Sequence, residues 1–273
     1  MSDPGTPTRN SGDVTGTSTP FLRTTLGVLL LRIAIVVAVL VAWEMASGRL
    51  ISKFWVSSPS AIFAVLRRWV ADGSLWMHLE ATVTAIGAGY VIGCGAGIAI
   101  GLLLGFLPRT QRVIAPFLSA FYSIPKIALA PLFVIAFGIG IESKICLVAV
   151  TVFFLVLFST IDGIRDVDPD LIESLEIMGA SRFEIATKLI IPAAKPWTFT
   201  GMRISVRYAT TAAILGEVIA ANRGIGFLIE YNSGQFNAAG VFAAVLILVL
   251  VGVVVTELLT RLERGSAPAV LPF

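Results

Sequence analysis

The sequence predicts an all-α, polytopic membrane protein with six transmembrane helices. Of its 273 residues, 56% are hydrophobic and only 14% are charged, and the mean hydropathy is +0.91. The apolar residues gather in long runs instead of being spread evenly, as a bilayer requires of the segments that cross it. This composition excludes an ordinary soluble enzyme.

Charge and side-chain chemistry exclude further classes. The net charge is +3, but the Lys and Arg residues are scattered between apolar segments and form no basic face, which argues against nucleic-acid binding. Cys94 and Cys146 both lie inside apolar runs, so neither a disulfide framework nor a cysteine metal site is expected. His78 is the lone histidine, which argues against a histidine metal site and a histidine-based catalytic triad.

The N-terminal third contains a tail, one span and an interfacial segment. Residues 1–22 are polar and lack apolar periodicity, and we expect a disordered cytoplasmic tail. Residues 23–48 contain the first transmembrane helix, which is too long for the apolar core of a signal peptide. Residues 49–78 form an outer amphipathic segment with one apolar helical face, made by Ile62, Phe63, Leu66, Trp69 and Val70.

The remaining five spans form a permeation core over residues 79–262. The second span, 79–107, carries a glycine at every fourth position, and such a stripe lets another helix pack closely; its members are Gly89, Gly93, Gly97, Gly101 and Gly105. The third span, 113–137, contains three prolines, so we expect a kinked or broken helix; they are Pro116, Pro125 and Pro131. The last three spans are predicted at 145–164, 198–221 and 238–262, before a cytoplasmic tail at 263–273. Six spans place both termini on one side, and the excess of Lys and Arg there indicates that this side is cytoplasmic.

The loop 165–196 is the only inward segment long enough to fold by itself. Asp168-Pro169 is typical of an N-cap followed by the first helical position. Gly179 is predicted to end the short amphipathic helix that begins there. Ser181 and Glu184 have the spacing of a capping box, which opens a second helix that we expect to stop at Pro192. From physics alone, this helix–turn–helix could equally be an ordinary connector on the membrane surface.

The arrangement of this loop resembles the EAA loop of ABC transporter permeases. The resemblance rests on the run Glu173-Ser174-Leu175-Glu176-Ile177-Met178-Gly179-Ala180-Ser181, followed by Ile191-Pro192. Further segments look like the nitrate/sulfonate/taurine-type subfamily: Pro59-Ser60, Ile124 to Leu132, Phe137-Gly138-Ile139-Gly140, Gly201-Met202-Arg203-Ile204, and Glu217 with Gly224-Ile225-Gly226. Together they cover about residues 59–263 and imply the fold of a type I ABC importer permease.

The resemblance implies that the loop couples this chain to a separate ATP-binding subunit. The implied ATPase-coupling residues are Glu173, Leu175, Gly179, Ala180, Ser181, Arg182 and Pro192. The chain departs from the family pattern at Ser174 and Leu175, which replace two alanines, so the details of docking are expected to differ.

The fifth predicted span carries charges that should face protein or water instead of lipid. Arg203, Arg207, Thr210, Ile214 and Glu217 fall on one helical stripe. Arg207, with Tyr208 and Thr211, is the main candidate to attract an anionic solute, and Lys126 in the third span is a weaker one. Alternatively, the arginines reach the interface or pair with neighbouring helices, and Glu217 anchors the packing of the outer gate.

The resemblance implies a permease subunit of an ATP-driven importer for a small anionic solute of the sulfonate, taurine or nitrate kind. No Gly-x-x-x-x-Gly-Lys-[Ser/Thr] loop occurs, so ATP and Mg²⁺ are expected on the partner ATPase and no cofactor on this chain. The implied partners are a second copy of the chain, two cytoplasmic ATPase subunits, an extracytoplasmic substrate-binding protein and the lipid of a bacterial cytoplasmic membrane. A secondary transporter would instead need paired midplane charges, and a membrane-embedded enzyme a nucleophile–base or metal cluster.

Overall fold

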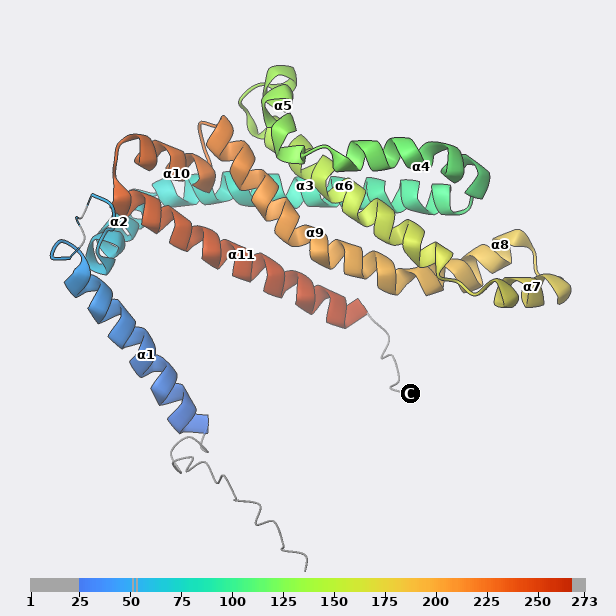
Figure 1. Cartoon of the computed structure of the whole chain (residues 1–273), viewed down its shortest axis with the longest axis horizontal. Coiled ribbons are helices and arrows are strands. Elements are labelled where there is room, and N and C mark those ends of the chain that lie inside the picture. Colours follow the sequence, from blue (N-terminus) through green and yellow to red (C-terminus); the bar gives the residue numbers. More distant parts are fainter. Residues whose placement is uncertain (1–24, 51, 53, 267–273) are drawn as a thin grey trace, which may run out of the picture. The chain divides into compact units, whose positions relative to one another are not determined.

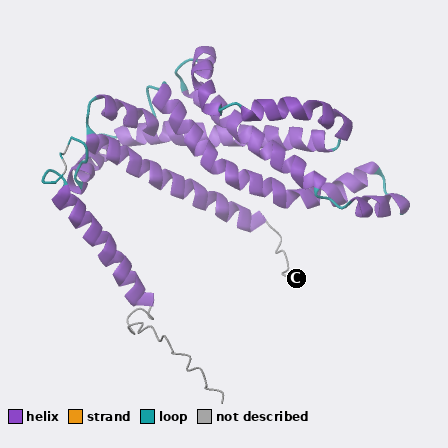
Figure 2. Cartoon of the chain, in the orientation of Figure 1, coloured by secondary structure: helices purple, strands orange, loops and turns teal. Residues whose placement is uncertain are grey.

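The computed structural model describes residues 25–50, 52 and 54–266, and the regular elements of this part are helices (Figures 1 and 2). The all-α prediction is therefore confirmed. The predicted tail at 1–22 lies outside the described residues. The chain divides into two compact units, Met1–Ser52 and Lys53–Phe273, and each is described by itself.

The first unit contains α1, Thr25–Ala46, whose 22 residues agree with the first predicted span. The second unit begins with the predicted amphipathic segment, in which α2 spans Pro59–Ala71. Ser58 caps α2, because its side chain accepts a hydrogen bond of 3.3 Å from the backbone N–H of Ala61. Ile62 is buried, whereas Phe63 and Val70 remain exposed.

The centre of the second unit is a close pair of parallel helices, α3 (Ser74–Gly105) and α6 (Ile141–Arg165). The glycine stripe of α3 faces α6: a Cβ added at Gly93 would lie 2.6 Å from the carbonyl oxygen of Ala149, and one at Gly97 would lie 2.9 Å from that of Phe153. Each of the five glycines meets a β-branched side chain of α6 in register, namely Val148, Val152, Val156, Thr160 and Ile164. The two backbones can therefore approach without intervening side chains on α3.

The third predicted span is broken, as its prolines indicate. It consists of α4 (Pro108–Ser123), the 3₁₀ helix η2 (Lys126–Leu129) and α5 (Ala130–Phe137). The axis bends by 82° at the break, next to Pro125. Pro116 lies inside α4 without ending it.

The last part of the chain packs across the central pair. The helix α9, Ile191–Ile219, runs antiparallel to α6, because Gly201 packs on Ser159 near one end and Gly216 on Leu147 near the other. It is followed by α10 (Ile225–Gly234) and α11 (Ala238–Ser266). The buried core contains residues from α3, α6, α9, α10 and α11. We call the end of this bundle where α3 begins the α10 end, and the opposite end the α7 end.

By length and composition, the described residues contain four helices that can cross a membrane, or five if the broken segment counts as one span. The four are in α1, α3, α6 and α11. The prediction of six spans is therefore matched only in part. The helix α9 is long enough, but Lys195, Arg203, Arg207 and Glu217 lower its apolar character. Its long axis lies beside those of α3 and α6 in Figure 1.

Candidate functional site

The α7–α8 hairpin, residues 168–185, lies at the α7 end of the bundle (Figure 1). Its first helix, α7, spans Pro169–Ile177 and begins at Asp168, whose side chain accepts a 2.9 Å hydrogen bond from the backbone N–H of Asp170. Its second helix, α8, spans Arg182–Ile185 and begins with the predicted capping box of Ser181 and Glu184. Both short helices are thus held at their starts by their own side chains.

The capping box has a clear electrostatic signature. The backbone N–H of Ser181 donates to Glu184 Oε2 over 3.0 Å, and Lys188 forms an ion pair of 3.0 Å with Glu184 Oε1. Because these donors stabilise the charged carboxylate, they lower the pKa of Glu184 to about 2. The carboxylate therefore remains charged throughout the physiological pH range.

The turn between the two helices depends on Gly179. Its φ is +83°, a left-handed conformation that side chains with a Cβ rarely adopt. The backbone N–H of Gly179 donates to the carbonyl of Glu176, and that of Ala180 donates to the carbonyl of Leu175. No heavy atom lies within 4 Å of an added Cβ, so only backbone conformation restricts this position.

The tip of the hairpin exposes large apolar side chains. Ile177, Met178 and Phe183 are 81%, 80% and 76% exposed, and the carboxylates of Glu173 and Glu176 are exposed beside them. Large apolar side chains exposed beside charged ones are typical of a protein–protein contact. Leu175, which departs from the family pattern, is half-buried and does not lie at the most exposed part of the tip.

The prediction that the second helix stops at Pro192 is wrong. After α8 the chain forms a π-helix, η3 (Ala186–Ile190), and passes directly into α9, with Pro192 in its first turn. Pro192 has no N–H to donate, and the π turn before it, in which the N–H of Ile191 donates to the carbonyl of Ala186, accommodates the missing hydrogen bond. Figure 1 shows the helix axis turning where α8 gives way to α9, and π segments and prolines are common causes of such a kink.

A buried polar group at the α10 end joins three helices. Glu217 is 3% exposed, and its Oε2 accepts hydrogen bonds from Thr82 Oγ1 over 3.0 Å and from the backbone N–H of Gly226 over 2.8 Å. Thr82 Oγ1 in turn accepts from the N–H of Ile225, and His78 Nδ1 accepts from the N–H of Gly224. We call these three side chains and residues 224–226 the α10 cluster. The three side chains accept hydrogen bonds from the first N–H groups of α10, which have no partner within the helix itself.

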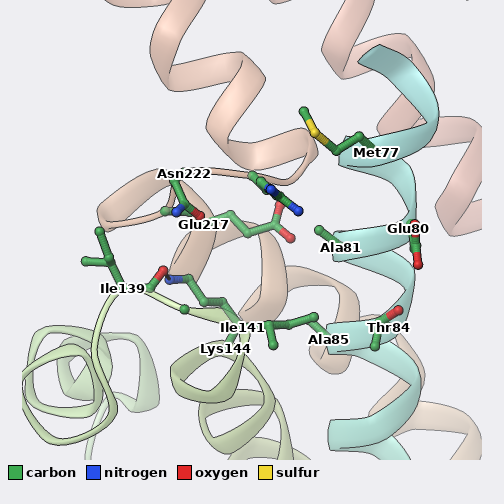
Figure 3. A pocket seen from close by; sticks show the side chains of 13 residues that line it. Met77, Glu80, Ala81, Thr84, Ala85, Ile139, Ile141, Lys144, Glu217 and Asn222 are labelled. Carbon is green, nitrogen blue, oxygen red and sulfur yellow. Dashed lines mark hydrogen bonds between the residues drawn. The ribbon is translucent and has the colours of Figure 1, made fainter. Parts of the chain in front are cut away.

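A cavity of about 400 Å³ lies beside the α10 cluster (Figure 3). The start of α3, the turn before α6 and the end of α9 line this open cavity, and Glu217 and Lys144 are among its lining residues. Lys144 is 3% exposed and donates hydrogen bonds to the carbonyls of Ile139, over 2.9 Å, and Ala220. Exposed Glu80 and Arg223 line its edge.

The predicted stripe on α9 is divided by its neighbours. Within the stripe, Arg203 and Arg207 are exposed in the isolated chain, whereas Ile214 and Glu217 are buried where α10 covers the stripe. The neighbouring path candidates Tyr208 and Thr211 are also exposed. The structure thus separates Glu217 from the other predicted path residues. Arg207 lies near the middle of α9, about 24 Å from its start.

Lys126 lies at the break between α4 and α5. Its ammonium group is 4.0 Å from the ring centroid of Tyr122 and 5.5 Å from that of Phe154, and it donates to the carbonyl of Tyr122. Phe154 is near the middle of α6, about 20 Å from its start, so the break places a partly exposed cation about halfway along α6.

The sequence interpretation missed Lys144, Thr82 and the role of His78. A lysine in the first turn of an apolar span was a possible signal for Lys144, but the partners of all three lie far away in the chain. Within the described residues, there is no group of three or more His, Cys, Asp or Glu that could hold a metal ion.

Comparisons with known proteins agree on one family. Residues 97–267 match the family described as "Binding-protein-dependent transport system inner membrane component". The chain is 35% identical over 230 residues to the formylaminopyrimidine transport permease protein ThiX of Halalkalibacterium halodurans, covering 84% of this chain and 91% of the relative. It is 31% identical to the taurine transport system permease protein TauC of Escherichia coli, and the match covers 83% of this chain and 84% of that relative.

A solved structure has a similar fold. A chain of the MetNI methionine ABC transporter, in an inward-facing conformation, superimposes with a TM-score of 0.57 at 22% identity. The match covers 73% of the present chain and 97% of that chain.

Proposed function

The chain belongs to the family of binding-protein-dependent transport system inner membrane components, and we propose that it forms the translocation path of an ATP-driven ABC importer for a small anionic solute of the sulfonate, taurine or nitrate kind. Its relatives are permease subunits, so it is a multi-pass membrane transport protein and not an enzyme. In this proposal ATP and Mg²⁺ bind to a partner subunit.

The observation that carries the proposal is the tip of the α7–α8 hairpin. It combines two capped helices, a turn that requires Gly179, and exposed apolar side chains between acidic ones. This surface is suited to a groove on a cytoplasmic ATPase subunit. Ala180, Ser181 and Arg182 shape the turn, and Glu173 and Leu175 flank it. Pro192 lies in the first turn of α9, the helix that carries the motion into the membrane.

The proposed assembly contains two copies of the chain, two ATPase subunits and an extracytoplasmic substrate-binding protein in a bacterial cytoplasmic membrane. The hairpin and both termini then lie in the cytoplasm, and the α10 end lies outside. Half-exposed charges near the middle of a bilayer require water or protein around them. Arg203, Arg207, Tyr208, Thr211 and Lys126 therefore line the path between the two copies, whereas Glu217 holds its outer end together.

A co-purification experiment tests the proposal. The tagged chain is expressed with its neighbouring operon genes, solubilised in mild detergent, and compared with an Ile177→Glu/Phe183→Glu double variant. Both side chains are exposed, so their replacement should leave the membrane helices intact. Glu230→Gln, an exposed change on α10, is the matched control.

We expect an ATPase subunit to co-purify with the wild type and the control but not with the double variant. An ATPase that stays bound to the double variant would contradict docking at the hairpin tip. If no ATPase accompanies the intact wild type, the importer proposal is wrong and an ATPase-independent secondary transporter replaces it.

A further inference from the structure

The α7–α8 hairpin projects beyond the ends of α6 and α9, so its two connections to these helices must carry any force applied at its tip (Figure 1). No residue of α7 is buried, and the apolar side chains of the tip are exposed. The second connection continues as helix through η3 into α9. The first is different, because α6 ends at Arg165 and three non-helical residues, 166–168, precede α7.

This linker, residues 166–168, would let α7 pivot at the end of α6 unless another contact holds it. Val167 is buried, whereas Asp166 is exposed and its side chain reaches across to α9. There Asp166 Oδ2 accepts a hydrogen bond of 3.1 Å from Trp197 Nε1–H, 31 positions away in the chain. Hydrogen bonds to a carboxylate are stronger than those between neutral groups, so this bond ties the linker to the second turn of α9.

Trp197 is itself held firmly against the end of α6. A Cβ added at Gly163 would lie 2.6 Å from Trp197 Cβ and 3.1 Å from Ala194 Cα, so α9 lies directly on the backbone of α6 here. Beside this contact, Thr198 Oγ1 donates to Thr160 Oγ1 over 3.3 Å. The indole N–H therefore reaches the linker from a rigid base.

We propose that Trp197 is a positioning residue for coupling: its indole N–H locks the linker, so that the hairpin, α6 and α9 move together when the tip is displaced. This role rests on the proposed function, in which the hairpin docks on an ATPase subunit. Since α9 carries Arg203 and Arg207, the locked linker passes the displacement to side chains of the proposed path. With the linker unlocked, α7 would turn about residues 166–168 and part of the displacement would be lost.

The test combines two measurements on the full-length chain in lipid nanodiscs. Without ATPase, hydrogen–deuterium exchange reports on the amides of residues 166–171. In the complex with the ATPase, a spin label at partly exposed Ile219, the last residue of α9, reports the distance between the two copies with and without Mg-ATP and vanadate. The labelled protein has alanine in place of Cys94 and Cys146, the free cysteines.

The variants separate the hydrogen bond from the packing around it. Trp197→Phe keeps the Cβ and an aromatic ring on Gly163 but removes the N–H donor. Asp166→Leu removes the acceptor, and Asp166→Asn keeps an acceptor oxygen. Trp76→Phe is the matched control, because Trp76 is 59% exposed on α3 at the other end of the bundle.

We expect Trp197→Phe and Asp166→Leu each to speed exchange of residues 166–171 at least threefold. Each should also at least halve the nucleotide-dependent distance change at Ile219 while basal ATPase activity is kept. Asp166→Asn should stay closer to wild type, and Trp76→Phe should match it. Combining Trp197→Phe with Asp166→Leu should add nothing, because both remove the same bond.

Three results would overturn the inference: exchange of residues 166–171 is unchanged in Trp197→Phe, the distance change at Ile219 is complete in that variant, or Asp166→Asn is no better than Asp166→Leu. A general loss of stability would instead speed exchange along the whole of α6 and α9, and would also count against it. If the wild type binds no ATPase, the co-purification experiment rejects the proposed function and this role with it. If the ATPase binds and Trp197→Phe moves α9 normally, this inference alone is rejected.

Discussion

Thr82 and Glu217, 135 positions apart in the chain, are joined by a buried hydrogen bond of 3.0 Å from Thr82 Oγ1 to Glu217 Oε2. The same two side chains accept from the N–H groups of Ile225 and Gly226. The start of α10 is therefore held by side chains of α3 and α9. This arrangement fixes the backbone at the edge of the cavity.

Replacing Glu217 by Leu should destabilise the protein, because the N–H of Gly226 and the hydroxyl of Thr82 would lose a buried acceptor. An unsatisfied buried group costs roughly 1–3 kcal/mol. We expect the thermal midpoint of the detergent-solubilised chain to fall by about 5 °C or more. Glu217→Gln keeps an acceptor oxygen, so its thermal midpoint should fall much less. Equal losses of thermal midpoint in the Leu and Gln variants would show that charge, and not hydrogen bonding, holds the cluster.

Two glycines of α3 should respond oppositely to alanine. A Cβ at Gly93 would lie 2.6 Å from the carbonyl oxygen of Ala149, whereas Gly95 has nothing within 4 Å. Gly93→Ala should therefore lower the thermal midpoint by forcing α3 and α6 apart. Gly95→Ala should raise it slightly, because alanine is favoured over glycine in a helix by about 1 kcal/mol. Changes of the same sign in both variants would contradict the close packing described for this pair.

Gly179→Val should uncouple transport from ATP hydrolysis in the reconstituted complex, because valine disfavours the φ of +83° that the hairpin turn needs. Gly179→Asn is the matched variant, since asparagine tolerates this conformation better than other side chains. We expect solute-stimulated ATPase activity to be lost in the first and largely kept in the second. Normal transport by Gly179→Val would refute the requirement for this turn.

Arg207→Gln should reduce uptake of an anionic solute by about tenfold or more while changing basal ATPase activity little. The reason is that Arg207 is exposed on α9, remote from the hairpin that we propose contacts the ATPase. Arg207→Lys retains the charge and should keep more of the transport. Parallel losses of uptake and basal activity in Arg207→Gln would indicate a structural role instead.

Local signals in the sequence predicted the local structure well. The caps at Asp168 and Ser181 and the break near Pro125 each depend on residues within a few positions of one another, and the structure has all three. The stop predicted at Pro192 failed because the π segment before it allows the helix to continue. That π segment leaves no residue signature that spacing alone can reveal.

The polar groups at the α10 end were harder to predict because their partners are distant in sequence. Glu217 lies on the same helical stripe as Arg207, yet α10 covers Glu217 and leaves Arg207 exposed. Helical spacing specifies which residues share a face, but not which neighbour covers it. Likewise, Lys144 is buried only because the carbonyls of Ile139 and Ala220 converge on it.

The glycine stripe of α3 has a mechanical consequence. Its glycines and the β-branched residues of α6 both recur every four positions, so the contact fits only at intervals of roughly 6 Å along the axis. A smaller slide would press side chains such as Val152 against the longer residues between the glycines. The two helices can therefore pack only in discrete registers and cannot slide past each other by small steps. They should move as one rigid body. Motion during a transport cycle must then occur at the surfaces around this pair, and not within it.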